Sequence, residues 1–177
     1  GTEADRAPVG GVDVAQVVAG GDPHVERLAG VGLAMARTPR RGLLWMVGIG
    51  VFKRLYDKRF PIRRMEPIDV YGGSDDASIA ADNTSAFNCR NAVASGPPTW
   101  SQHAYGLAID VNPVENPYIL EGDVLPPAGK EFVDRRNVRP GMAVRGGELV
   151  VAFAEAGWSW GGVWANPDYQ HFSAAGN

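Results

Sequence analysis

Two of the three histidines lie in segments that also contain an aspartate at short spacing. His103 comes seven residues before Asp110, and His171 comes three residues after Asp168. Two imidazoles and one carboxylate form a ligand set for Zn²⁺ that leaves a coordination position open, as catalytic zinc sites require. We therefore predict a zinc site held by His103, Asp110 and His171, although each histidine taken alone is more often structural.

Asp168 is the candidate for proton transfer beside such a metal. An open zinc site polarises a carbonyl group and lowers the pKa of a water molecule to about 7. A nearby carboxylate that does not bind the metal then serves as general base toward water and general acid toward a departing amine. Because positions 168 and 171 of an ideal strand face opposite sides, we expect Asp168 to lie in a bend after Pro167.

The elements that must position these side chains are predicted from hydrophobic periodicity. Apolar and polar residues alternate over 107–112, which predicts a half-buried strand with Asp110 on its polar face. We expect His103 in a turn that enters this strand, where Gly106 permits the tight backbone. A last strand is expected around 169–172.

The remaining elements follow from the same patterns. Helices are predicted up to about Phe60, before Pro61, and over 148–156, before Gly157. Short strands are predicted over 68–70 and 85–90, and loops over 72–82 and the proline-rich segment 112–129. The apolar face of the 85–90 strand is expected to carry Phe87 and Cys89, with Cys89 as a small buried residue.

Three further residues are candidates for contact with a substrate. Arg90 ends the 85–90 strand, where its guanidinium is able to bind a carboxylate or a developing oxyanion; a surface ion pair explains it equally well. Trp164 is a candidate for the wall of a cleft, whereas Trp158 and Trp160 are expected to pack in the core. Ser101, two residues before His103, is the third candidate. His24 is interpreted as a structural or surface residue.

Length and composition indicate one globular domain. The chain has 177 residues, of which 45% are hydrophobic and 21% are charged, and its 23 glycines and 13 prolines argue against a helical bundle. We predict an α+β fold with a central antiparallel sheet flanked by helices. Residues 1–22 are expected to form a weakly ordered arm, and 23–177 the domain. The single cysteine excludes an internal disulfide, and no apolar run is long enough for a transmembrane segment.

The charge is unevenly distributed. The net charge of −3 argues against general nucleic-acid binding. Residues 37–64 nevertheless contain nine Lys and Arg residues against Asp57 alone. We interpret this stretch as a solvated helix face with its loops. The alternative is a patch attracted to an anionic polymer such as a bacterial wall.

The motif SQHAYGLAID at 101–110 is similar to the S-x-H-x-x-G-x-A-x-D signature of the bacterial zinc D-alanyl-D-alanine peptidase family. That family includes vancomycin-resistance D,D-peptidases and L-alanyl-D-glutamate endopeptidases. Other segments also resemble sequences of this family: NTSAFNCR at 83–90, DVNPVENPY at 110–118, AFAEAGWSWGGVW at 152–164 and DYQHF at 168–172. The resemblance therefore covers about residues 60–172. The SAFNCR and DYQHF forms resemble the L-alanyl-D-glutamate branch more closely.

This resemblance implies that His103, Asp110 and His171 hold Zn²⁺, that Asp168 is the catalytic acid and base, and that Arg90 steadies the substrate carbonyl or carboxylate. It implies the small α+β fold shared with the zinc-containing Hedgehog signalling domain. Some relatives with this fold keep the metal site without catalysis, so fold alone does not give function.

We therefore expect a monomeric zinc peptidase that cuts the stem peptide of peptidoglycan, secreted or held at the bacterial cell surface. The scissile bond is either the terminal D-Ala–D-Ala bond or the L-Ala–D-Glu bond. The alternatives are a non-catalytic, zinc-stabilised wall-binding module and, less favoured, a zinc amidase that cuts between sugar and peptide.

Overall fold

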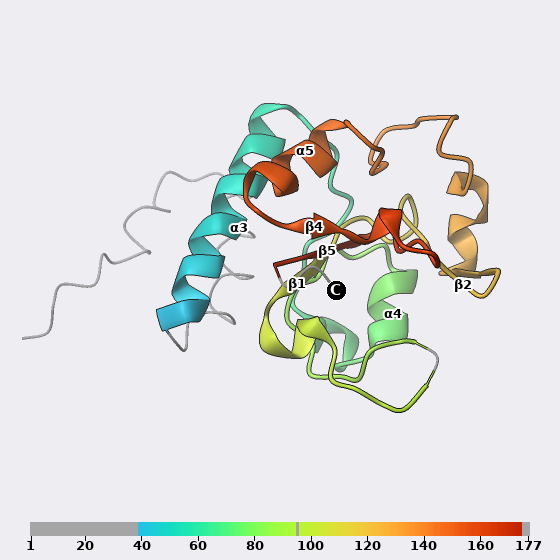
Figure 1. The fold of residues 1–177 in the computed structure, drawn as a ribbon, viewed down its shortest axis with the longest axis horizontal. Helices are drawn as coiled ribbons and strands as arrows, with labels where there is room; N and C mark the ends of the chain where they lie inside the picture. The colour runs from blue at the N-terminus through green and yellow to red at the C-terminus, as the bar shows by residue number, and fades with distance from the viewer. Residues whose placement is uncertain (1–38, 95, 175–177) are drawn as a thin grey trace, which may run out of the picture.

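The computed structural model describes residues 39–94 and 96–174 (Figure 1). The expected arm at 1–22 and His24 lie outside this part of the chain. Its elements, in order, are α3 (Pro39–Asp57), η1 (Ile68–Tyr71), α4 (Asp75–Ala80), η2 (Gln102–Tyr105), β1 (Ala108–Asp110), β2 (Tyr118–Leu120), β3 (Asp123–Leu125), η3 (Pro127–Phe132), α5 (Glu148–Glu155), β4 (Ser159–Trp160), η4 (Gly161–Val163) and β5 (His171–Ser173). Helices and strands are thus mixed, as expected for an α+β protein.

The strands form two small antiparallel sheets rather than one. The first has the order β1-β5-β4, and the second is the β2–β3 hairpin. In the first sheet, Ile109 pairs with Phe172, and Asp110 pairs with His171. Because successive side chains of a strand point to opposite faces, this register places two apolar residues on one face and two polar residues on the other.

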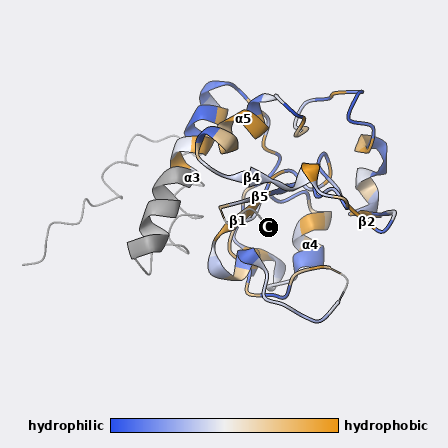
Figure 2. Cartoon of the chain, in the orientation of Figure 1, coloured by the Kyte–Doolittle hydropathy of each residue, from blue (hydrophilic) through white to orange (hydrophobic). Residues whose placement is uncertain are grey.

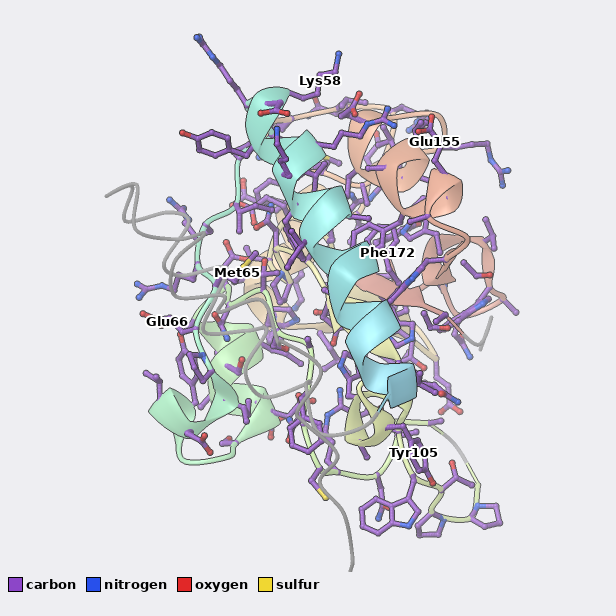
Figure 3. The ribbon with its side chains drawn as sticks, turned by 90° about the vertical axis from the view of Figure 1, so that its left-hand side faces the viewer. Lys58, Met65, Glu66, Tyr105, Glu155 and Phe172 are labelled. Atoms are coloured by element: carbon purple, nitrogen blue, oxygen red, sulfur yellow. The ribbon has the colours of Figure 1, made fainter. Side chains whose placement is uncertain are left out.

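The apolar face of the sheet packs against α3 and α5. Phe153 of α5 stacks on Phe172 with ring centroids 4.1 Å apart, and Phe52 of α3 meets Phe153 edge-on at 6.3 Å. Figure 3 shows α5 beside the C-terminal part of α3, with Phe172 labelled next to α3. The hydrophobic residues of α5 stand out against the largely hydrophilic connection that precedes it (Figure 2). The core therefore lies between these two helices and the sheet.

The helix predictions at both places are confirmed. The α3 helix buries Val51, Phe52 and Leu55, and the α5 helix buries Leu149 and Phe153. Gly157, immediately after the C-cap residue of α5, has a φ of 80°, which suits glycine at the end of a helix.

Two predictions between residues 66 and 82 are wrong. The expected strand over 68–70 is the 3-10 helix η1, and the expected loop over 72–82 contains α4. Ser74 caps α4 by accepting the Ala77 N–H at 3.2 Å, and Asp75 follows it in the first turn. This local capping outweighs the small, acidic composition that favours a loop.

The loop predicted over 112–129 contains the β2–β3 hairpin. Its turn residues Glu121 and Gly122 both have positive φ, at 53° and 98°, as type I′ hairpin turns require. Glutamate is an unusual first residue for this turn, and prolines lie on both sides. The sequence therefore lacks the usual signal for a hairpin.

The segment 85–90 is not a continuous strand; Ser85 forms an isolated antiparallel bridge with Asp110. Its expected burial is also reversed, because Ala86 and Asn88 are buried while Cys89 is exposed. Asn88 tolerates burial because its side chain hydrogen-bonds to Asp75. This reversal turns Asn88 toward Asp75, which borders the candidate site.

Several of the described basic side chains of residues 37–64 pair with carboxylates of the protein itself. Arg54 bridges α3 to Glu148 and Glu155 of α5, and Lys53 pairs with Asp57 at 2.7 Å. These contacts favour the interpretation of the stretch as a solvated helix face over that of a free adhesive patch. Within 39–94 and 96–174, no helix is both long and apolar enough to cross a membrane.

Asn116 joins the irregular segments around the core. It is fully buried and donates through Nδ2 to the carbonyls of Val111 (3.0 Å) and Gly141 (2.9 Å). Its Oδ1 accepts the Ala143 N–H at 2.6 Å and Arg135 Nη1 at 3.1 Å. A single side chain thus satisfies backbone groups from two loops.

We expect Asn116→Ala to lower the free energy of unfolding by about 3 kcal/mol or more, because it leaves several buried polar groups without partners. Urea denaturation gives the comparison. The control is Asn137→Ala in an exposed loop, which should stay within about 0.5 kcal/mol of wild type. Equal destabilisation by both variants would contradict the assigned role.

Glu115 and Asp82 form a carboxyl pair near this network. Asp82 is buried and accepts the Val114 N–H at 2.9 Å. Partial burial raises the pKa of Glu115 to about 7, and both a hydrogen bond to Asp82 and repulsion by its charge add to this effect. The positive charge of Arg63 lowers the pKa but does not offset the rise. The folded chain therefore keeps a proton at Glu115 that the unfolded chain releases above its ordinary pKa of 4.5.

Wild-type stability should consequently fall, relative to Glu115→Gln, as pH rises through the interval between these two pKa values, since the folded state binds more protons there. Tm measured from about pH 5 to pH 8 on both proteins isolates the effect, because all other groups titrate in both. Parallel Tm curves would show that Glu115 keeps its ordinary pKa.

Candidate metal centre and its cavity

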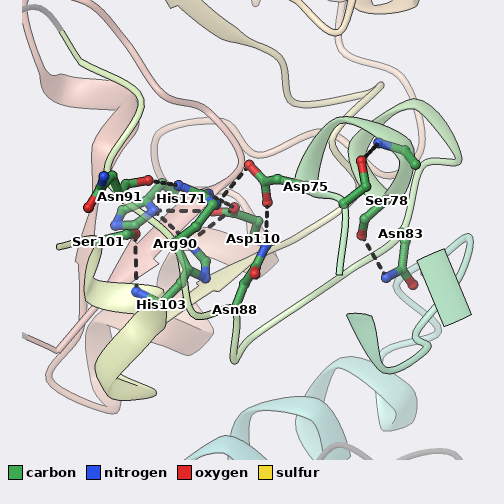
Figure 4. A network of polar contacts seen from close by, with 12 residues as sticks. Asp75, Ser78, Asn83, Asn88, Arg90, Asn91, Ser101, His103, Asp110 and His171 are labelled. Carbon is green, nitrogen blue, oxygen red and sulfur yellow. Dashed lines mark hydrogen bonds and ion pairs between the residues drawn. The ribbon is translucent and has the colours of Figure 1, made fainter. Parts of the chain in front are cut away.

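Three short elements position the candidate ligands. His103 lies on the 3-10 helix η2, which Ser101 caps by accepting the His103 N–H at 3.2 Å and which Gly106 ends with a φ of 68°. Asp110 ends β1, and His171 begins β5 directly opposite it. The turn into β1, expected from the sequence, therefore brings the imidazole back to the carboxylate (Figure 4).

The ligand atoms converge with spacing suited to a tetrahedral ion. Asp110 Oδ2 lies 3.1 Å from His103 Nε2, and Asp110 Oδ1 lies 3.1 Å from His171 Nδ1. The two imidazole nitrogens are 3.4 Å apart. Zinc bound at about 2.0 Å to each ligand would separate tetrahedral neighbours by about 3.3 Å. All three residues are buried, so the donor set fits Zn²⁺.

The orientation of the rings also fits a metal site. His103 Nδ1 lies 2.6 Å from the Ala86 carbonyl. The ring donates its Nδ1 proton there, which leaves the lone pair of Nε2 directed at the other ligands. The His171 ring packs against Trp164 with centroids 5.3 Å apart. Among the described residues its buried Nε2 has no hydrogen-bond partner.

The charges of the candidate ligands shift one another's pKa values. Burial opposes ionisation of Asp110, but the adjacent imidazoles outweigh it and hold the pKa of this carboxyl well below its usual range. Burial likewise opposes the charge on His103, yet Asp110 raises the pKa of the imidazole. The site is therefore built to keep an ionised carboxylate beside a positive charge.

Asp168 lies outside β5, in an isolated antiparallel bridge with Tyr118 that a bend at 169–170 separates from the strand, as its spacing to His171 requires. Its N–H donates to the Gly161 carbonyl at 3.1 Å, and its own carbonyl accepts the His171 N–H at 3.3 Å. Within the described part of the chain, its enclosed Oδ1 has no hydrogen-bond partner. Burial and repulsion from Asp110 raise the pKa of Asp168 to about 7. A carboxyl group in this state is able both to accept and to donate a proton near neutral pH.

The other three candidates also border the site, in different ways. Arg90 is neither free in the cleft nor on the open surface, because Nε pairs with Asp75 Oδ2 at 2.8 Å and the side chain is 20% exposed. The hydroxyl of Ser101 is engaged as the cap of η2. Trp164 forms part of the wall beside His171.

A cavity of about 680 Å³ opens over these residues. Its wall includes residues that sequence patterns did not indicate: Asp75, Asp76, Trp100, Tyr118 and Gln170. Burial and the charge of Asp168 raise the pKa of Tyr118. The Ser-Asp-Asp capping signal before α4 was the one clue to Asp75 and Asp76, whereas nothing local to Tyr118 or Gln170 indicates a cavity.

Residues 95–174 match the family model described as D-alanyl-D-alanine carboxypeptidase. The matched segment contains the three candidate ligands and Asp168, whereas Arg90 and α4 precede it. The match supports, over this segment, the family resemblance found in the sequence. Comparison with curated proteins and with solved structures gave no match.

We expect the chain to bind one Zn²⁺, to gain thermal stability from it, and to lose that gain with a chelator, because a ligand that binds only the folded state stabilises it. Asp110→Asn should weaken zinc affinity more than about 100-fold, since it removes a direct ligand rather than an outer partner. Competition with a chromophoric chelator measures the affinity.

The matched control is His24→Ala, which removes the one histidine that we do not assign to the site and should keep wild-type affinity. Undiminished zinc binding by Asp110→Asn would exclude this carboxylate as a ligand.

Proposed function

We propose that this protein is a zinc-dependent peptidase that hydrolyses a bond in the stem peptide of bacterial peptidoglycan. The observation that carries the proposal is the convergence of His103, Asp110 and His171 with Asp168 on one cavity. A binding module stabilised by zinc has no need of an enclosed carboxyl group beside its metal. The family match supports the same class of reaction.

A zinc ion held by the three ligands would supply Lewis acidity toward the scissile carbonyl and toward water. Asp168 takes the proton of the attacking water and returns it to the departing amine nitrogen. Its place in the wall of the same cavity suits both steps. The Nη2 group of Arg90 lies 3.9 Å from Asp110 Oδ2, and we propose that it donates to a substrate carbonyl oxygen bound beside this carboxylate.

The charges of the cavity favour an internal bond over the terminal one. A carboxypeptidase must bind the free carboxylate of its substrate, and a forked arginine is the usual partner. Arg90 is the single lysine or arginine of the described cavity wall, and its Nε already pairs with Asp75 while Nη1 donates to the Asn91 carbonyl. We therefore propose cleavage at L-Ala–D-Glu in preference to removal of D-Ala.

The substrate lies outside the bacterial membrane. We accordingly propose that the protein is secreted or acts at the cell surface.

Asp168→Asn should bind zinc as tightly as wild type but lose at least about 100-fold in turnover, because the variant lacks the group that moves the proton. Mass spectrometry of purified muropeptides incubated with the zinc-loaded proteins measures this loss. Asp123→Asn, at the exposed first residue of β3, is the matched control. Near wild-type turnover in Asp168→Asn would remove Asp168 from the reaction.

The products identify the bond. A muropeptide that ends in L-alanine, together with a stem that begins at D-Glu, supports the endopeptidase, whereas loss of one terminal alanine supports the carboxypeptidase. Glycan chains freed of the whole stem would indicate an amidase. Zinc binding without any cleavage would favour the wall-binding module.

A further inference from the structure

Beside the ligand Asp110 lies a chain of polar contacts that the reaction itself does not require (Figure 4). Asp75, in the first turn of α4, accepts a hydrogen bond from Asn88 Nδ2 through Oδ1 at 3.0 Å. Its Oδ2 pairs with Arg90 Nε at 2.8 Å. The side chains of Asp75 and Arg90 are only 14% and 20% exposed, so water weakens this pair less than it would on the surface.

Further contacts fix Arg90 at both ends. Its carbonyl accepts the Ser101 N–H at 3.1 Å, which ties it to the cap of η2. Its Nη1 donates to the Asn91 carbonyl at 3.1 Å. The guanidinium therefore has one edge toward α4, and its Nη2 remains on the side of Asp110.

Arg90 and Asp110 lie close together but do not form a hydrogen bond. Arg90 Nη2 lies 3.9 Å from Asp110 Oδ2, which is too far for a hydrogen bond, although the two groups carry opposite charges. That same Oδ2 lies 3.1 Å from His103 Nε2, where a metal would need it. An unrestrained arginine at this place would close on the carboxylate and form strong, paired hydrogen bonds to it.

We propose that Asp75 is a positioning residue that holds Arg90 back from Asp110. It keeps the Asp110 carboxylate available to the metal and keeps Arg90 Nη2 directed at the cavity. This inference rests on the proposed metal site. The same segment also orients a ligand directly, because the Ala86 carbonyl fixes the His103 ring. Residues 86, 88 and 90 thus all support the site: Ala86 contacts His103 through its carbonyl, and Asn88 and Arg90 both contact Asp75.

The test is a measurement of Zn²⁺ affinity by chelator competition on four variants of the full chain. Asp75→Asn should weaken zinc binding roughly 10-fold, as loss of an outer partner does at other metal sites. Arg90→Gln should keep wild-type affinity, because it removes the competing cation. In Asp75→Asn combined with Arg90→Gln, the effect of Asp75→Asn should disappear.

Asp76→Asn is the matched control. Asp76 is the next residue of the same helix turn and borders the same cavity, but it is exposed and forms no hydrogen bond or ion pair with Arg90. A loss caused only by removing negative charge near the metal would appear in both aspartate variants. A loss confined to Asp75→Asn supports positioning.

Three results would overturn the inference: wild-type affinity in Asp75→Asn, an equal loss in Asp76→Asn, or an undiminished loss in the Arg90→Gln background. If Asp75→Asn does not fold, weakened zinc binding in Arg90→Gln alone also overturns it, since Arg90 would then support the ligand rather than compete with the metal. Failure of wild type to bind zinc would instead contradict the metal site.

Discussion

The register between β1 and β5 is the constraint on which the rest of the structure depends. It sets Ile109 opposite Phe172 and Asp110 opposite His171. The first pair faces α3 and α5, and the second faces the cavity. A shift of the strands by one residue would bury the charged pair against the helices and expose the apolar pair. Packing of Phe172 on Phe153 therefore helps to hold the candidate metal ligands in place.

A ligand set that is buried needs support from groups that do not bind the metal. The Ala86 carbonyl fixes the His103 ring, Ser101 and Gly106 bound the short helix on which His103 lies, and Asp75 engages Arg90. These contacts come from loops and from helices of one or two turns. Most of the rigidity of the site therefore comes from hydrogen bonds rather than from long regular elements.

The buried asparagines have the same effect farther from the candidate metal site. Asn116 joins the loop after β1 to the segment before α5, and Asn112 donates to the Pro61 carbonyl beyond α3. Because glycine and proline leave many backbone groups outside helices and sheets, side-chain amides supply the partners that regular structure would otherwise provide. Proline-rich loops are thereby ordered enough to border a cavity.

The sequence by itself determined the parts that local periodicity and spacing control. These are the α3 and α5 helices, the turn at Gly106 into β1, the polar face that carries Asp110, and the bend that places Asp168 outside β5. The motif around His103 was also sufficient to indicate the family. Each of these features depends on residues close together in the chain.

Tertiary structure decided what depends on partners far apart in the chain. It reversed the burial of Ala86, Asn88 and Cys89, because α4 offers Asp75 as a partner to Asn88. It also made a hairpin of 118–125 and placed Tyr118 and Gln170 in the cavity wall. A local pattern states which side chains share a face, but the elements that pack against each face determine which one is buried.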